Sequence, residues 1–316
     1  MRDTLRIHLF GKFQARRGDE CVRDLETPKM QELFSFLLLH RERPLSRETL
    51  ATQLWGDSST IQSKEYLRKT LWQLQKALDP NGAPSDGPQV LVVEPSWIRV
   101  NATARIWLDV SVFEEAYAQV RSIPGQNLDA AQACLLDEAV ALYRDGLLVG
   151  LYQDWCFYER ERLQNLLFAI LDKLMTYSEA RQEYERGVQY GERILRLDRA
   201  HEATHRRLMR LLYALGDRTG ALRQYQRCVA HLNEELGVRP SSVTRRLYDA
   251  IAADLPAFEV GSVLHPSASP ARDSGDYSLV EVLAHLREFQ SDLNRMQQQV
   301  QRDIQKVEQV IGDERE

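Results

Sequence analysis

The chain has 316 residues, 43% of them hydrophobic and 28% charged, and a formal net charge of −5 at pH 7. This length predicts two domains plus an appendage, and the composition is typical of a protein with buried cores. No apolar run reaches the ~18 residues of a membrane span, and the first residues lack the apolar segment of a signal peptide. We therefore expect a cytoplasmic protein with no membrane partner.

The residues that carry chemistry show no arrangement typical of a catalytic or metal site. The four cysteines lie far apart without the paired spacings of zinc sites, and the seven histidines form no HExxH-like pair. A Gly-rich phosphate loop and a GxSxG elbow are also absent from the sequence. The sequence therefore predicts no enzyme, no cofactor and no metal. The net charge is +2 over residues 1–110 and −7 beyond them, which alone does not establish a DNA partner.

An alternating pattern opens the chain. Leu5, Ile7 and Leu9 face one way and polar residues the other, which predicts a half-buried strand. Residues 17–20 (RGDE) form a turn signal, and a second short strand is expected at 21–22.

Three helices and a hairpin are predicted next, at residues 28–42, 47–55, 60–78 and 90–100. Thr27 is a good N-cap with Pro28 at the first helical position, and Ser46 is the expected cap of the second helix. Residues 59–62 (STIQ) have the form of a capping box before the third. Strands, three helices and then a hairpin are the order of a winged helix.

The third helix combines an apolar stripe with a polar face. The stripe consists of leucines at helical spacing, Leu67, Leu71, Leu74 and Leu78. A step of ~100° per residue puts Glu65, Lys69, Trp72, Gln73 and Lys76 on the outer side, with Arg68 on its flank. An ordinary solvated helix face has the same pattern, so the residue types alone leave both interpretations open.

From residue 109 to about 255 the pattern is almost wholly helical, with Gly or Pro only at joints. The spacing of Gly216, Ala221, Tyr225 and Cys228 follows the second half of a tetratricopeptide unit. A shift of 33 residues places the equivalent positions at Val188, Glu192 and Leu195. We expect a helical-repeat domain with a concave surface for partners, and with Leu195 and Leu208 in its core.

The remaining residues form a predicted appendage. Residues 256–277 are small, polar and Pro-rich, as in a flexible linker, and residues 278–316 have heptad spacing. The expected seam of the coiled coil is Leu279, Val282, Leu286, Phe289, Leu293, Met296, Val300 and Val307. Asp303 interrupts it. We predict a homodimer through this helix; a helix that docks back on its own chain is the alternative.

Several motifs in order carry a resemblance to a known family. In the N-terminal part they lie at residues 37–47, 54–57 and 67–78, and in the helical part at 143–148, 154–155, 159–163, 205–209 and 235–241. The last, ELGVRPS, is the most specific. Over residues 5–255 the chain resembles the Streptomyces antibiotic regulatory protein type of regulator, in which a winged helix precedes a bacterial transcriptional activator domain.

The resemblance implies a mainly α protein. We expect a winged-helix DNA-binding domain with small β-sheets over 1–108, and the tetratricopeptide-like activator domain over 109–255, followed by the linker and the coiled-coil helix. The expected function is sequence-specific binding of double-stranded DNA by a transcriptional regulator, an activator that contacts RNA polymerase.

The same resemblance assigns roles to residues of the third helix and the wing. Base reading is expected from Arg68, Lys69 and Gln73, and backbone contacts from Lys64, Thr70, Lys76 and Arg99, with Trp72 as a possible DNA or wing contact. The family's Arg-Leu-Arg run is replaced here by Gln73-Leu74-Gln75. Amide groups therefore replace two guanidinium groups of the family pattern, which weakens phosphate contacts or favours A·T-rich targets. The alternative function is a protein-interaction scaffold whose winged helix no longer binds DNA.

Overall fold

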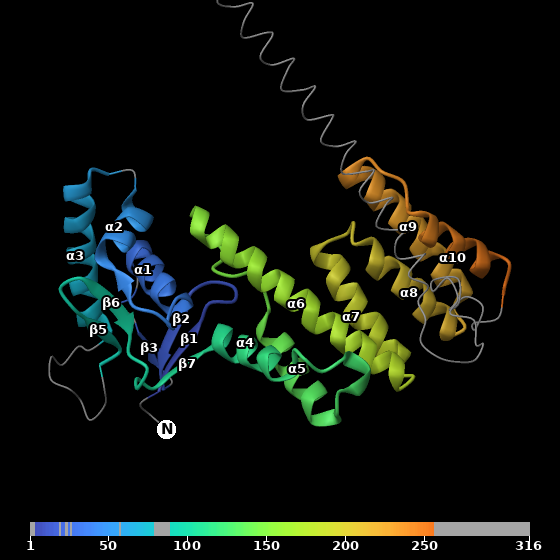
Figure 1. Ribbon diagram of the computed structural model, residues 1–316, viewed down its shortest axis with the longest axis horizontal. Coiled ribbons are helices and arrows are strands. Elements are labelled where there is room, and N and C mark those ends of the chain that lie inside the picture. Colours follow the sequence, from blue (N-terminus) through green and yellow to red (C-terminus); the bar gives the residue numbers. More distant parts are fainter. Residues whose placement is uncertain are drawn as a thin grey trace, which may run out of the picture. The chain divides into compact units, whose positions relative to one another are not determined.

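The computed structural model describes residues 4–255 except 19, 23–24, 26, 57 and 79–88. The predicted linker (256–277) and coiled-coil helix (278–316), with all the seam residues, lie outside the described residues. The described part is mainly helical, with two small sheets near the N-terminus (Figure 1). This confirms the predicted fold class. None of the helices within this part is long and apolar enough to cross a membrane.

The first sheet has the strand order β3-β2-β1-β7. Its strands are β1 (Leu5–His8), β2 (Gln14–Arg17), β3 (Glu20–Cys21) and β7 (Ile106–Leu108). The predicted burial of Leu5, Ile7 and Leu9 is confirmed. Instead of a single second strand, the structure has a hairpin of β2 and β3, turned by Gly18 at a positive φ of 61°. The sequence did not predict β7, which pairs parallel with β1 from a distant part of the chain.

A winged helix follows this sheet. Its elements are α1 (Pro28–Leu39), β4 (Leu45–Ser46), α2 (Arg47–Trp55), α3 (Thr60–Leu78), β5 (Leu91–Val93) and β6 (Trp97–Val100). The Ser46 hydroxyl accepts a hydrogen bond from the backbone N–H of Thr49, the predicted N-cap interaction. Strands β5 and β6 form the expected hairpin, which β4 extends to three antiparallel strands. All four leucines of the α3 stripe are buried.

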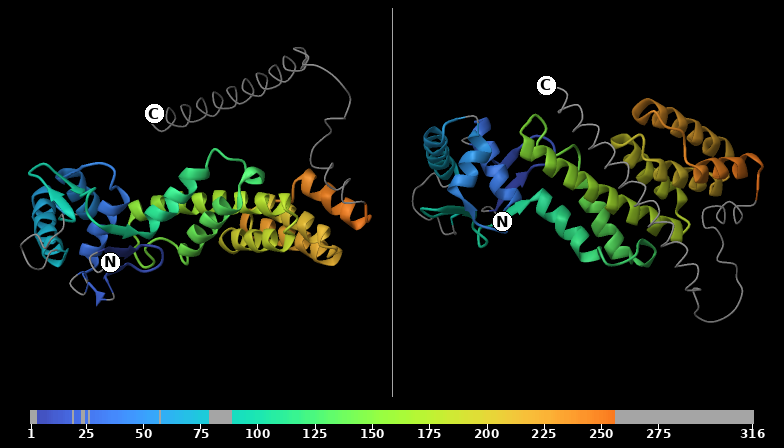
Figure 2. Two further views of the ribbon diagram at one scale, coloured as in Figure 1. Left: turned by 90° about the horizontal axis from the view of Figure 1, so that it is seen from below. Right: turned by 45° about the horizontal axis from the view of Figure 1, so that its top comes forward.

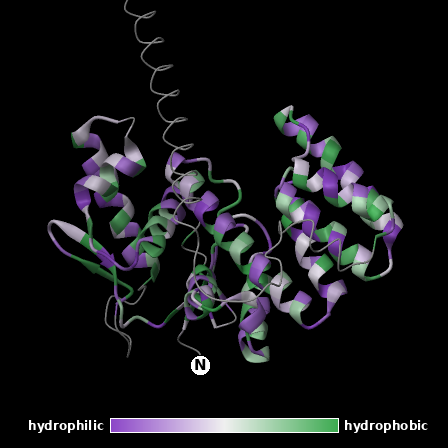
Figure 3. Ribbon diagram, turned by 45° about the vertical axis from the view of Figure 1, so that its right-hand side comes forward, coloured by the Kyte–Doolittle hydropathy of each residue, from purple (hydrophilic) through white to green (hydrophobic). Residues whose placement is uncertain are grey.

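The helical part runs from α4 to α10. The helices are α4 (Asp109–Val120), α5 (Ala130–Leu142), α6 (Asp154–Ala180), α7 (Tyr184–Leu197), α8 (Glu202–Ala214), α9 (Arg218–Leu236) and α10 (Ser242–Ala252), with a 3-10 turn at Gly125–Asn127. From α4 to α10, each helix contacts the next one in the chain, as in stacked helical repeats (Figure 2). Hydrophobic and hydrophilic residues are interleaved along these helices, so each has one side for packing (Figure 3).

The buried positions correct the predicted repeat by one residue. Gly187 and Ile194 on α7 are buried and lie 34 residues before the buried Ala221 and Cys228 on α9. The period is thus 34 rather than 33. The predicted core residue Leu208 is buried, but Leu195 is only half-buried because Ile194, one residue earlier, takes the core position.

The N-terminal sheet is bound directly to the helical part at Asp109, the first residue of α4. Its side chain is 1% exposed, and its carboxylate accepts hydrogen bonds from the backbone N–H groups of Leu9 and Phe10 (both at 2.9 Å) and Val110 (2.8 Å). Burial raises the pKa of Asp109, although these hydrogen bonds oppose the rise. A buried carboxylate therefore satisfies backbone donors from both parts.

Further contacts join the same two parts. The backbone N–H of Leu148 donates to the carbonyl of Leu9 at 2.8 Å, and the rings of Phe36 and Trp155 meet edge to face at 5.1 Å. One hydrophobic cluster extends through both parts, and the described residues fall within one compact unit. The winged helix is therefore packed against the repeats rather than tethered to them.

The ELGVRPS motif at residues 235–241 has a structural role. Gly237 ends α9 with a φ of 66°, in the left-handed region that favours glycine. Ser241 then caps α10, and its backbone N–H and hydroxyl both donate to the Glu202 carboxylate, at 2.9 and 2.7 Å. The motif thus orients the last described helix against α8.

Candidate nucleic-acid interface

The outer face of α3 presents a group of exposed cationic side chains. Lys64, Arg68, Lys69 and Lys76 are all exposed, because the buried leucine stripe turns this side of the helix outward. Within the described ranges, neither Arg68 nor Lys69 forms an ion pair. Their charges are therefore free for an anionic partner such as a phosphate or the acceptor edge of guanine. We call Lys64, Arg68, Lys69 and Lys76 the α3 basic face.

The two lysines at the ends of this face already have partners. Lys64 Nζ lies 2.7 Å from Glu48 Oε1 on α2, and this hydrogen bond and the lysine charge lower the pKa of Glu48. Lys76 Nζ lies 5.5 Å from the ring centroid of Trp72, within cation–π range. Both groups are exposed, so both contacts are weak enough to be exchanged for a phosphate contact.

Trp72 itself is 61% exposed on α3. A large apolar side chain in this position is uncommon on a solvated helix, and its ring contacts the Lys76 ammonium group rather than filling a core. Its exposed indole remains free to contact a sugar or base edge.

The wing adds one more cation. Arg99 on β6 is exposed, and its guanidinium lies 5.5 Å from the ring centroid of Trp97. The wing is fixed to the start of α2, because the backbone N–H of Arg47 donates to the carbonyl of Ser96 at 3.0 Å. The hairpin therefore holds Arg99 in a defined place relative to the helices.

Two predicted residues differ from the rest of the set. Thr70 is only 8% exposed and lies among the stripe leucines Leu67, Leu71 and Leu74, so we remove it from the expected phosphate contacts. Gln73 is half-buried, at the edge of the exposed face.

Sequence reasoning missed two exposed apolar residues of the same helix, Ile61 and Tyr66. The signal was present, since the helical step places Tyr66 within about 60° of Lys69. Tyr66 extends the outer surface of α3 with a side chain that has both a ring and a hydroxyl.

Comparison with known proteins agrees with this architecture. The family model of the bacterial transcriptional activator domain matches residues 108–252. The transcriptional regulatory protein MoaR1 of Mycobacterium tuberculosis is 25% identical over 235 residues, which cover 73% of this chain and 74% of that protein. These matches support the resemblance of the chain to the Streptomyces antibiotic regulatory protein type of transcription regulator. MoaR1 of Mycobacterium bovis is similar at 24% identity, with the same shares covered.

A solved structure has the same fold as this chain. It is Mycobacterium tuberculosis EmbR in complex with a low-affinity phosphopeptide, with a TM-score of 0.65 and 21% identity over 83% of this chain and 68% of that one. The resemblance inferred from the sequence motifs is confirmed, and the family is not enzymatic.

Proposed function

We propose that this regulator binds specific sites on double-stranded DNA through α3 and the wing. The observation that supports this most directly is the α3 basic face, in which Arg68 and Lys69 have no ion pair within the described part of the chain. Opposite charges three or four residues apart stabilise an exposed helix, but neither Arg68 nor Lys69 takes part in such a pair among the described residues. A winged helix with unpaired cations on its third helix fits the major groove.

We assign a DNA contact to each of these residues from its exposure and its position on α3 or the wing. Arg68 and Lys69 read base edges from the exposed centre of α3, and half-buried Gln73 contributes one amide group at most. Lys64, Lys76 and Arg99 contact the phosphates on either side of the groove, and Trp72 packs against the backbone beside Lys76. Because Gln73 and Gln75 replace cations, phosphate contacts account for less of the affinity than in the family pattern.

We propose further that the protein is cytoplasmic. When bound to DNA, it activates transcription by contacting RNA polymerase through the helical part. The start of α6 and the loop before it carry large exposed aromatic side chains, Tyr152, Phe157 and Tyr158. Such clusters mark protein interaction sites more often than solvated surface. A scaffold that binds partners without DNA would use the same surface, but would not need the unpaired cations of α3.

A titration of a fluorescent duplex at several salt concentrations tests the DNA-binding proposal. The logarithm of the association constant is expected to fall linearly with that of the salt concentration, with a slope of about −0.9 per neutralised phosphate. Binding that does not respond to salt, or no binding to any duplex at low salt, would favour the scaffold.

The predicted homodimer is a separate proposal, which suits paired half-sites on DNA. Light scattering on the full chain and on a chain that ends at Leu255 is expected to give a dimer and a monomer, because only the full chain has the heptad segment. Two monomers at micromolar concentration would contradict the coiled coil.

A further inference from the structure

A second basic site lies in the helical part, away from α3. A cavity of about 350 Å³ opens between α7, α8 and α9. Its lining includes Arg196, Arg199, His205, Gln224, Arg227 and His231. We call it the basic cavity. Neither the DNA-binding role nor the packing of the repeats requires so many cations at one place.

The floor of the basic cavity is built from buried polar groups. His205 and Gln224 are both buried; Gln224 Nε2 donates to His205 Nδ1 at 2.8 Å, and His205 Nε2 donates to the carbonyl of Arg199 at 2.8 Å. Burial lowers the pKa of His205, so the imidazole is neutral at pH 7 and fits this donor–acceptor order. The hydrogen bonds fix the turn between α7 and α8 that carries Arg199.

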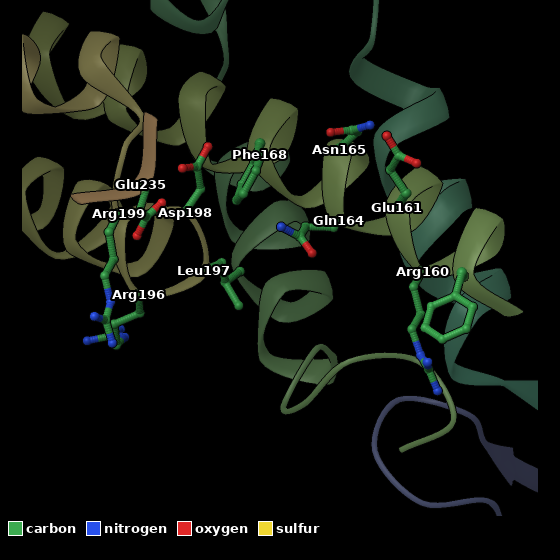
Figure 4. Close-up of a pocket in the computed structure, with 11 residues that line it drawn as sticks. Arg160, Glu161, Gln164, Asn165, Phe168, Arg196, Leu197, Asp198, Arg199 and Glu235 are labelled. Atoms are coloured by element: carbon green, nitrogen blue, oxygen red, sulfur yellow. The ribbon is translucent and has the colours of Figure 1, made fainter. Parts of the chain in front are cut away.

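The rim holds three exposed guanidinium groups, those of Arg196, Arg199 and Arg227. In the part of the chain that the structure describes, none of the three forms an ion pair. Figure 4 shows the cavity that adjoins this one, in which Arg196 and Arg199, at the end of α7 and in the turn that follows it, have their guanidinium groups on the same side. Like charges gathered without carboxylate partners repel one another, and a bound anion removes that repulsion.

The positive charge of the rim acts on one neighbouring group, and a second neighbouring group has an unsatisfied buried nitrogen. Burial lowers the pKa of Arg193, and the charge of Arg196 lowers it further. His231, across from His205, has a buried Nδ1 for which the described residues supply no hydrogen-bond partner. An unsatisfied buried nitrogen costs stability unless a ligand or water occupies the space before it.

Acidic side chains are few in this lining. Glu192 is the single carboxylate among the described residues that line the basic cavity, against three arginines. The adjoining cavity shares Arg196 and Arg199 but also contains Glu161, Asp198 and Glu235. The excess of cations is therefore a property of the basic cavity rather than of this whole end of the repeats.

We propose that the basic cavity binds a small molecule that carries two or more phosphate groups. Guanidinium groups bind phosphate oxygens in pairs, and three of them around a cavity of this size suit a compact polyanion. A floor closed by His205, Gln224 and Leu208 favours a compact ligand over an extended acidic peptide. Such a ligand bridges α7, α8 and α9. Its binding therefore transmits a signal to the activator domain.

Calorimetric titration of the full chain with inorganic pyrophosphate tests this proposal. Wild-type protein is expected to bind pyrophosphate, and the double variant Arg196→Gln/Arg199→Gln to bind at least about tenfold more weakly. The control Arg121→Gln/Arg246→Gln removes two exposed arginines outside the cavity and should stay within about twofold of wild type. Circular dichroism of each variant confirms that the fold is retained.

Two further ligands test whether the basic cavity prefers a phosphate-bearing small molecule to other anions. A hexaglutamate peptide should bind more weakly than pyrophosphate, and duplex DNA should bind the Arg196→Gln/Arg199→Gln variant as it binds wild type. The proposal is overturned by no pyrophosphate binding, by equal loss in the control, by tighter binding of the peptide, or by a loss of duplex affinity in the cavity variant.

Discussion

Replacing Asp109 with Ala is expected to lower the free energy of unfolding by about 3–5 kcal/mol. The Asp109 carboxylate accepts hydrogen bonds from the backbone N–H groups of Leu9, Phe10 and Val110, in a place closed to water. Ala leaves these donors buried without partners, and each such group costs about 1–3 kcal/mol before relaxation. Denaturant unfolding of the full chain measures the loss.

The pH dependence of this effect has a defined sign. Burial raises the pKa of Asp109 above its ordinary value of 3.8, so the folded state binds this proton more tightly than the unfolded state. This carboxyl's contribution to stability therefore decreases as the pH rises from 3.8 through the raised pKa. The difference in unfolding free energy between wild type and Asp109→Ala should shrink over the same interval.

Asp249→Ala is the matched control for Asp109. Asp249 is exposed on α10, and its replacement should change stability by less than about 0.5 kcal/mol. An Asp109→Ala protein as stable as this control would show that the carboxylate does not hold the sheet and α4 together. The winged helix and the repeats would then be joined by apolar packing alone.

Replacing Arg68 with Gln is expected to weaken binding to a specific duplex by about 1–3 kcal/mol and to relax one base preference. Arg68 is exposed at the centre of α3 and has no ion pair among the described residues, so its loss removes a DNA contact without disturbing the fold. Lys69→Gln should act similarly. Lys76→Gln should weaken all duplexes alike and reduce the salt slope by about 1.

The control for these variants is Arg121→Gln, which removes an exposed arginine at the end of α4. Its duplex affinity should match wild type, because a cation distant from the groove contributes little at physiological salt. If Arg68→Gln and Arg121→Gln bind a specific duplex equally well, α3 is not the reading helix.

The helices of the winged part could be predicted because their signals are local. The spacing of Leu67, Leu71 and Leu74 fixed the buried side of α3, and Ser46 marked the start of α2. Strand β7 gave no such signal, because three residues become a strand only by pairing with β1, about 100 residues earlier in the chain. Non-local pairing of this kind is invisible to periodicity.

Two residue assignments failed for different reasons. Thr70 was assigned by its place in the family pattern, although it lies beside Leu71 and Leu74 on the helical wheel and is buried with them. Leu195 was assigned from an internal repeat with a period one residue too short.

On α7 the small residues Gly187 and Gly191 allow close contact with α8, since a Cβ on Gly191 would lie 2.7 Å from Leu208.

The basic cavity was not predicted at all. Its cations come from α7, the α7–α8 turn and α9, and are up to about 30 residues apart in the sequence. In the sequence, each of them is indistinguishable from an ordinary exposed arginine. Only the antiparallel packing of the repeats brings them to one opening. By contrast, the α3 basic face lies on a single helix, so its members could be found from helical spacing.

Selection from a random duplex library tests the central claim, DNA recognition through α3, most directly. Wild-type full-length protein is expected to enrich one sequence motif, and Arg68→Gln to lose the preference at one position of that motif while retaining the others. Enrichment of no motif by wild-type protein, or the same motif with the same preferences from Arg68→Gln, would contradict the account.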